Sequence, residues 1–213
     1  MALLNNKILF VHINKSGGGI FTKNFLKNGI NKLTGYHRTL QDMLNKTESY
    51  YNLKKEDLYI FTVVRNPWDR MLSMYLFYNQ YGYTDFFPDN IGFNITFKDW
   101  IKYIYSDKFD KRKMHSAVNM SKYCFSDQIN WLLDDKGQII NINKILRFEN
   151  LKEELFPFLK DTLGLQYIIT QKVHPTIHNH YSEYYDEETK LLVEKHYQKD
   201  IEIFGYKFEN KKE

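Results

Sequence analysis

Two stretches of the chain have the pattern of a buried strand, a loop and a helix. In the first, the apolar run at residues 8–11 ends in a glycine-rich turn, and apolar positions then recur with helical spacing over residues 20–26. In the second, the β-branched and aromatic run at residues 58–64 precedes apolar positions at helical spacing over residues 71–78, with Pro67 near the first turn. A run that is polar on neither face is typical of a parallel sheet covered by helices on both sides. The pattern therefore predicts an α/β fold with ligand-binding loops at the carboxyl ends of its strands.

The rest of the chain adds further predicted elements. Hydrophobic spacing and capping residues predict a short helix from Leu40, with Thr39 as its N-cap, and a polar segment over residues 45–57. An aromatic surface excursion over residues 79–94 and an amphipathic helix over 96–104 follow. The chain then continues with a strand over residues 144–148, a helix over 149–159 and a last amphipathic helix over 186–204. No internal repeat or low-complexity linker interrupts this order, so we expect a single domain over residues 1–213.

The turn after the first strand has the composition of an anion site. Gly17, Gly18 and Gly19 let backbone N–H groups crowd around one point, and a helix that begins there adds the positive end of its dipole. Lys15 and Ser16 add a cation and a hydroxyl. The alternative is a flexible loop with a solvated lysine. A Walker A loop places its lysine after the glycines, whereas Lys15 precedes them, and this order argues against an ordinary ATP or GTP hydrolase.

A second anion-binding pair follows the second strand run. Arg65 and Ser73 lie eight residues apart, one at the end of the strand and one two turns into the helix. A guanidinium and a hydroxyl in these places suit a second phosphate. The alternative is that Arg65 pairs with Asp69 and that Ser73 lies on the helix surface.

Composition narrows the class of protein. A net charge of +4 suits an anionic nucleotide or an acidic glycan but is too small to indicate nucleic-acid binding. The single cysteine, Cys124, excludes an intrachain disulfide and a cysteine-rich zinc site, and we expect it to be buried. No stretch reaches the roughly 18 apolar residues of a membrane span, and the start lacks the pattern of a signal peptide. We therefore expect a soluble cytoplasmic protein.

Both motifs resemble those of a known enzyme family. Residues 12–18, His-Ile-Asn-Lys-Ser-Gly-Gly, resemble the His-Ile-Pro-Lys-Thr-Gly-Gly loop of the carbohydrate-type (Golgi-type) sulfotransferases, which use 3′-phosphoadenosine 5′-phosphosulfate (PAPS). Residues 64–75 look like the 3′-phosphate-binding motif of that family almost residue for residue. Residues 146–151 and 184–206 are similar to its later landmarks, so the resemblance spans about residues 7–208.

The resemblance implies a P-loop-like three-layer fold, with a central parallel sheet flanked by helices, and transfer of a sulfuryl group from PAPS to a hydroxyl of a carbohydrate acceptor, with PAP as product. It assigns Lys15, Ser16, Gly17, Gly18, Gly19 and Ile20 to the 5′-phosphosulfate, and Arg65 and Ser73 to the 3′-phosphate. We expect no metal, because a sulfuryl group carries less charge than a phosphoryl group. Asn14, Gly19 and Ile20 depart from the family's usual Pro, Thr and Ser.

Two residues are candidates for the chemical step. Lys15 would neutralise the leaving phosphate. His37 would be the general base, because Gly35-Tyr36-His37 lies between the two motifs and is similar to the Gly-Leu-His setting of the catalytic histidine in glycan 6-O-sulfotransferases. Glu149 is the alternative base, and His37 as an ordinary loop residue is the alternative without chemistry.

Other possibilities remain open from the sequence. His174, His178 and His180 have a spacing that suits either a metal site or a solvated loop. The whole protein is alternatively a nucleotide-dependent phosphoryl transferase (kinase) of related fold, or a non-catalytic module that binds nucleotide or glycan.

Overall fold

The computed structural model describes residues 2–4, 6–21, 37–83, 86–89, 92–109, 123–162 and 178–211. These residues form two compact units. We call them the sheet unit, Met1–Arg65 with Asn130–Pro175, and the helical unit, Asn66–Ile129 with Thr176–Glu213. The expectation of a single domain over residues 1–213 stays a prediction.

The sheet unit is built on one mixed sheet in the strand order β1-β2-β3-β4. Strands β2 (Ile8–Val11), β3 (Tyr59–Val64) and β4 (Lys144–Arg147) are parallel, as predicted. Strand β1 (Ala2–Leu4) pairs with β2 in the antiparallel direction. The sequence did not predict β1, because three residues are too few to show a period.

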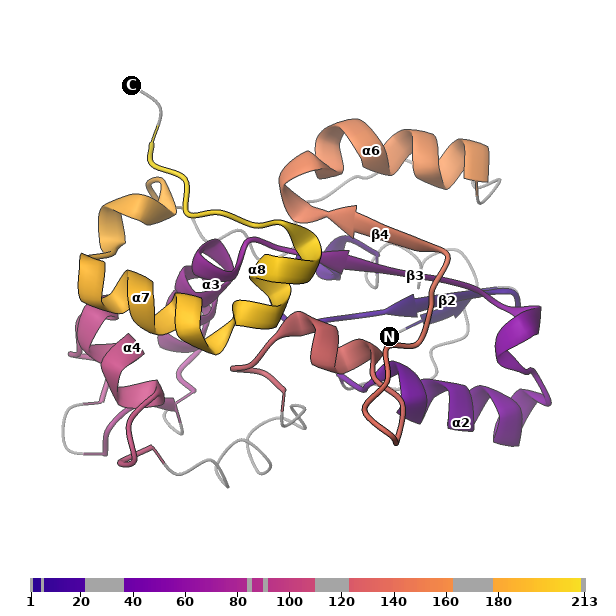
Figure 1. The fold of residues 1–213 in the computed structure, drawn as a ribbon, viewed down its shortest axis with the longest axis horizontal. Helices are drawn as coiled ribbons and strands as arrows, with labels where there is room; N and C mark the ends of the chain where they lie inside the picture. Colours follow the sequence, from indigo (N-terminus) through magenta and orange to yellow (C-terminus); the bar gives the residue numbers. More distant parts are fainter. Residues whose placement is uncertain are drawn as a thin grey trace. The chain divides into compact units, whose positions relative to one another are not determined.

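Helices lie on both sides of this sheet (Figure 1). Phe10 pairs with Phe61 across β2 and β3, and this face packs against α6 (Leu151–Pro157) and η5 (Phe158–Thr162). Helix α2 (Leu40–Tyr51) lies on the other side of the strands (Figure 1). The α/β fold with a parallel sheet flanked by helices is confirmed. Burial of both faces explains why the second strand run is almost entirely β-branched and aromatic.

Helix α2 begins as predicted and ends later than predicted. Thr39 is its N-cap, and its side-chain oxygen accepts a hydrogen bond from the backbone N–H of Asp42. The helix runs to Tyr51, through much of the expected polar segment. Leu40, Met43 and Thr47 are buried. The polar residues in between belong to the solvent-facing side of an amphipathic helix, which is why the segment lacked an apolar run.

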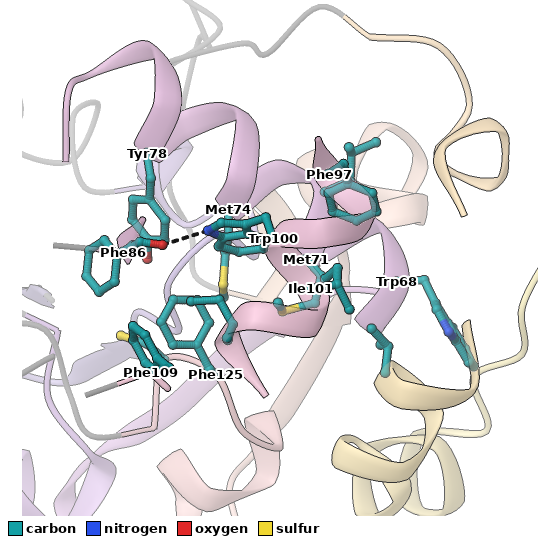
Figure 2. Close-up of a cluster of buried hydrophobic side chains, with 14 of the residues drawn as sticks. Trp68, Met71, Met74, Tyr78, Phe86, Phe97, Trp100, Ile101, Phe109 and Phe125 are labelled. Atoms are coloured by element: carbon teal, nitrogen blue, oxygen red, sulfur yellow. Dashed lines mark hydrogen bonds between the residues drawn. The ribbon is translucent and has the colours of Figure 1, made fainter. Parts of the chain in front are cut away.

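In the part of the helical unit that the structure describes, four helices pack around an aromatic core. These are α3 (Pro67–Gln80), α4 (Phe97–Ile104), α7 (Glu187–His196) and α8 (Gln198–Phe204). Figure 2 shows part of the core, where Trp100 donates a hydrogen bond from its indole N–H to the carbonyl of Phe86. The helices predicted over residues 71–78 and 96–104 are confirmed.

The expected surface excursion over residues 79–94 was wrong for its aromatic centre. Phe86 is 0% exposed and Phe87 1%, and both belong to the buried cluster of the helical unit. Large aromatic side chains gain more from packing than a turn-rich backbone loses from burial, provided that carbonyls such as that of Phe86 find donors.

The last helix begins as predicted but is interrupted. Asp186 caps α7 by accepting a hydrogen bond from the backbone N–H of Thr189. The chain then leaves helical geometry at the fully buried Tyr197, and α8 follows in its own direction (Figure 1). Asp200 at the start of α8 accepts hydrogen bonds from the backbone N–H groups of Gln128 and Ile129. These hydrogen bonds to a distant part of the chain hold α8 in place. The spacing of apolar residues along the helix could not predict them, because it reports only local structure.

Short helical turns complete the described part of the chain: η1 (Lys55–Asp57), η3 (Gln128–Leu132), η4 (Phe148–Asn150) and η6 (Tyr181–Tyr184). The helix predicted after the glycine-rich turn is seen in its first residues, 19–21, and its continuation over residues 22–26 lies outside the described residues.

Candidate functional site

The glycine loop, residues 12–19, leaves β2 and starts a helix. Two of its residues have left-handed backbone conformations, Lys15 with φ 59° and Gly17 with φ 85°. The first helical turn then forms, because the N–H groups of Ile20 and Phe21 donate to the carbonyls of Gly17 and Gly18 at 3.1 Å. The strand, the loop and the first turn of the helix predicted for an anion site are therefore present.

Two glycines of the loop are required by close approach as well as by conformation. A Cβ on Gly18 would overlap the imidazole ring of His12, and a Cβ on Gly17 would lie 2.5 Å from the ring of Phe148. Real Cβ atoms do not approach carbon atoms so closely. The loop is thus packed between two aromatic rings, and neither His12 nor Phe148 was singled out for this role from the sequence.

Ser16 ties the loop to itself. Its hydroxyl is fully buried and donates a hydrogen bond to the carbonyl of Ile13 at 2.7 Å. We expected this hydroxyl at the phosphosulfate, and that contact stays a prediction. The observed bond gives Ser16 a structural role in shaping the turn.

Arg65 joins the second motif to the first. One Nη atom of its guanidinium donates a hydrogen bond to the backbone carbonyl of Lys15 at 3.2 Å. The guanidinium also lies over the ring of Phe148, with 4.1 Å between Cζ and the ring centroid. Arg65 is only 6% exposed. The structure therefore brings together the arginine and the glycine loop that the sequence placed 50 residues apart.

Strand pairing explains why these two motifs meet. Strands β2 and β3 are parallel, with Val11 opposite Thr62, and the Thr62 hydroxyl donates to the carbonyl of Val11 at 2.8 Å. Both strands therefore end at the same edge of the sheet. Arg65 and the glycine loop leave that edge side by side.

Burial makes this edge favourable for an anion. Burial and, to a smaller extent, the charge of Arg65 lower the pKa of Lys15 to about 7. Burial, as the largest cause, and the charges of the neighbouring His37 and Lys15 lower the pKa of His12 well below its usual value. Positive charge is costly here until an anion is bound, so a bound phosphate or sulfate would stabilise the charged form of Lys15.

The side chain of His37 lies beside His12, the residue that follows β2. Its Nδ1 is 2.9 Å from the carbonyl oxygen of His12, and the two imidazole ring centroids are 4.4 Å apart. Its ring also meets that of the buried Trp131 edge to face. A carbonyl only accepts hydrogen bonds, so Nδ1 carries the proton and the neutral ring keeps its lone pair on Nε2. This is the tautomer that a base acting through Nε2 needs.

The remaining predicted residues are placed as follows. Ser73 lies in α3 of the helical unit and is 2% exposed. The alternative interpretation, that Ser73 lies on the surface of its helix, was therefore wrong. Glu149 is exposed in η4, next to Phe148. The roles of both residues in binding or catalysis stay predictions.

Two of the three histidines of the predicted metal or loop segment, His178 and His180, lie within the described residues. His180 caps η6 by accepting a hydrogen bond from the N–H of Ser182, and His178 contacts the carbonyl of Asn179. His174 lies outside the described residues. Within the described ranges, histidine, cysteine, aspartate and glutamate side chains form no group of three or more that would hold a metal ion.

Other residues of the second motif hold the helical unit together. Asn66 caps α3 and donates to the carbonyl of Lys207 at 3.0 Å. The indole N–H of Trp68 donates to the carbonyl of Lys190, and the fully buried Arg70 donates to the carbonyl of Cys124 at 2.9 Å. Sequence reasoning found the motif but not these partners, because they lie more than 50 residues away.

Comparison with known families supports the resemblance. The model of the Sulfotransferase family matches residues 4–207, nearly the whole chain. The chain belongs to the sulfotransferase family. Members transfer a sulfuryl group from a small-molecule donor to an acceptor, and the fold of this sulfotransferase agrees with that family. The comparison with curated proteins returns no matching sequence.

None of the helices in the described part of this sulfotransferase has the length and apolar character needed to cross a bilayer.

The packing of the glycine loop makes a testable prediction. Gly18→Ala should lower the free energy of unfolding by about 1–3 kcal/mol, because the new methyl group meets the His12 ring. Combining it with His12→Ala should cost clearly less than the sum of the two single changes, since the smaller residue makes room. Chemical denaturation of the four proteins measures both effects. Additive costs would show that the ring does not restrict this glycine.

Proposed function

We propose that this sulfotransferase transfers the sulfuryl group of PAPS to a hydroxyl group of a carbohydrate, with PAP as the second product. The observation that carries the proposal is the hydrogen bond from Arg65 to the carbonyl of Lys15. It places the guanidinium of Arg65 against the backbone of the loop that carries Lys15, so a cationic side chain follows each of two neighbouring strands. A nucleotide with two separate anionic groups requires such a pair. The mild positive charge of the chain suits both an anionic donor and an acidic saccharide.

The residues at the sheet edge have the chemistry that the donor needs. Lys15 and the backbone of the glycine loop, from Ser16 to Ile20, would hold the 5′-phosphosulfate through charge and amide N–H groups. Arg65 would hold the 3′-phosphate through its planar guanidinium. The assignment of Ser73 to the same phosphate rests on the family resemblance alone.

Two side chains would carry the chemical step. His37 would accept the proton of the acceptor hydroxyl on Nε2 as the oxygen attacks sulfur, because its Nδ1 is held by the carbonyl of His12. Lys15 would neutralise the charge that develops on the 5′-phosphate as the bond from its oxygen to sulfur breaks. We propose that no metal takes part, since the transferred group carries less charge than a phosphoryl group. Bound PAPS would supply the activated sulfuryl group.

A cytoplasmic location is part of the proposal. It is supported by the single cysteine, which is buried and agrees with a reducing compartment.

Ligand binding separates the proposed donor from ATP. Adenosine 3′,5′-bisphosphate should raise the unfolding temperature, and MgATP should not. Lys15→Ala and Arg65→Ala should each weaken the bisphosphate by about 10- to 150-fold, the equivalent of one lost charge-assisted hydrogen bond. Lys144→Ala, which removes an exposed lysine of the same unit, is the control and should bind normally. Stabilisation by MgATP alone would favour the phosphoryl transferase instead.

Donor binding should depend on pH through Lys15. Its pKa is lowered to about 7 in the ligand-free site and should rise when a phosphate binds, so binding takes up a proton. The affinity for adenosine 3′,5′-bisphosphate should therefore fall above pH 7, by up to about tenfold per pH unit. Lys15→Gln should remove this slope. Calorimetry in two buffers of different ionisation enthalpy measures the proton uptake, and an unchanged slope in Lys15→Gln would assign it to another group.

Transfer activity tests the base. His37→Gln should lower the rate of labelled sulfate transfer from PAPS to a glycan panel by about 10²- to 10⁴-fold while binding of adenosine 3′,5′-bisphosphate is kept. His178→Gln, in the helical unit, is the matched control and should keep full activity. If Glu149→Gln loses transfer and His37→Gln does not, the carboxylate is the base. A wild-type protein that binds the bisphosphate but never transfers sulfate would be the non-catalytic module.

A further inference from the structure

The side chain of Phe148 meets both Arg65, which follows β3, and the glycine loop, which follows β2. It directly follows β4, whose last residue, Arg147, is opposite Val64 of β3. One residue further along each strand, Phe148 and Arg65 therefore leave the sheet at the same level. The face of the Phe148 ring meets the guanidinium of Arg65, at 4.1 Å from its centroid.

The edge of the same ring meets the glycine loop. A Cβ on Gly17 would lie 2.5 Å from Cδ2 and 2.9 Å from Cε2 of Phe148, so the ring fills the space that any other residue at position 17 would need. Behind the ring lies the apolar cluster of the sheet unit, which includes Phe10, Phe61 and Leu151. The ring is thus held from behind and touches both anion-binding motifs in front.

We propose that Phe148 is a positioning residue of the donor site, which holds the guanidinium of Arg65 beside the glycine loop. This inference rests on the proposed function, because it assumes that Arg65 binds a phosphate of the donor. A ring against its face leaves the edge of a guanidinium available for hydrogen bonds, and one such bond goes to the carbonyl of Lys15. Arg65 is thereby ordered before the anion arrives, and binding costs less side-chain entropy.

The nature of the ring matters to this role. A leucine would fill much of the same space but has no π face to attract the cation. A tyrosine keeps that face. Phe148→Leu should therefore weaken the binding of adenosine 3′,5′-bisphosphate by about 3- to 30-fold, and Phe148→Tyr should bind within about twofold of the wild type. Donor KM should rise in Phe148→Leu while kcat at saturating donor is kept.

Phe158→Leu is the matched control. Phe158 belongs to the same apolar cluster and packs on Phe61, with 5.0 Å between ring centroids. Among the described residues, its ring meets those of Phe61 and Tyr59. Its replacement should lower the unfolding temperature about as much as Phe148→Leu and leave bisphosphate affinity unchanged. Equal loss of affinity in the two variants, or no rescue by tyrosine, would overturn the proposal.

A measurement without ligand tests the contact independently of the donor. Phe148→Leu should lower the unfolding temperature less in an Arg65→Met background than in the wild type, because the stacked pair is already broken. Equal shifts in the two backgrounds would overturn the proposal. A further outcome is that this coupling holds but the wild type binds no bisphosphate. The donor assignment would then fail, Phe148 would only support Arg65 structurally, and the proposed role of Phe148 in donor binding would be overturned.

Discussion

The candidate site depends on the parallel pairing of β2 with β3. Register places Val11 opposite Thr62, and the hydroxyl of Thr62 adds a bond to the carbonyl of Val11 beside the ladder. Because the strands run in the same direction, whatever follows them leaves at one edge of the sheet. A shift by one residue would turn the alternating side chains of β2 to the opposite face. It would also separate Arg65 from the carbonyl of Lys15.

Packing rather than solvent sets the electrostatics of this edge. Arg65 lies over the ring of Phe148, the rings of His12 and His37 lie against each other, and Lys15 is partly buried, so positive charge is poorly hydrated here. Desolvation lowers the pKa of Lys15 to about 7, so the free protein holds less charge here than its sequence suggests. In the proposed donor complex, a bound anion would favour the charged form of Lys15 that burial disfavours in the free protein. The same environment keeps the ring of His12 neutral, as a packing surface for Gly18.

The six-residue motif after β3, Arg65 to Arg70, serves two purposes. Arg65 turns to the glycine loop, whereas Asn66, Trp68 and Arg70 bind backbone carbonyls of the helical unit. These buried donors all have acceptors, and the loss of any one would leave a carbonyl without its partner. Asn66, Trp68 and Arg70 therefore have structural roles in this motif, beside the proposed binding of the donor by Arg65. For that reason the motif by itself does not identify the acceptor.

Sequence alone determined the α/β class, the three parallel strands, the starts of α2, α3, α4 and α7, and the glycine loop with its arginine. These features follow from local periodicity, capping side chains and motif order, which are written in neighbouring residues. Only the tertiary structure decided that Phe86 and Phe87 are buried, that the last helix breaks at Tyr197, and that His12 and Phe148 enclose the glycine loop. Each of these depends on a partner far away in the chain, and no local pattern records which distant side chain will fill a given space.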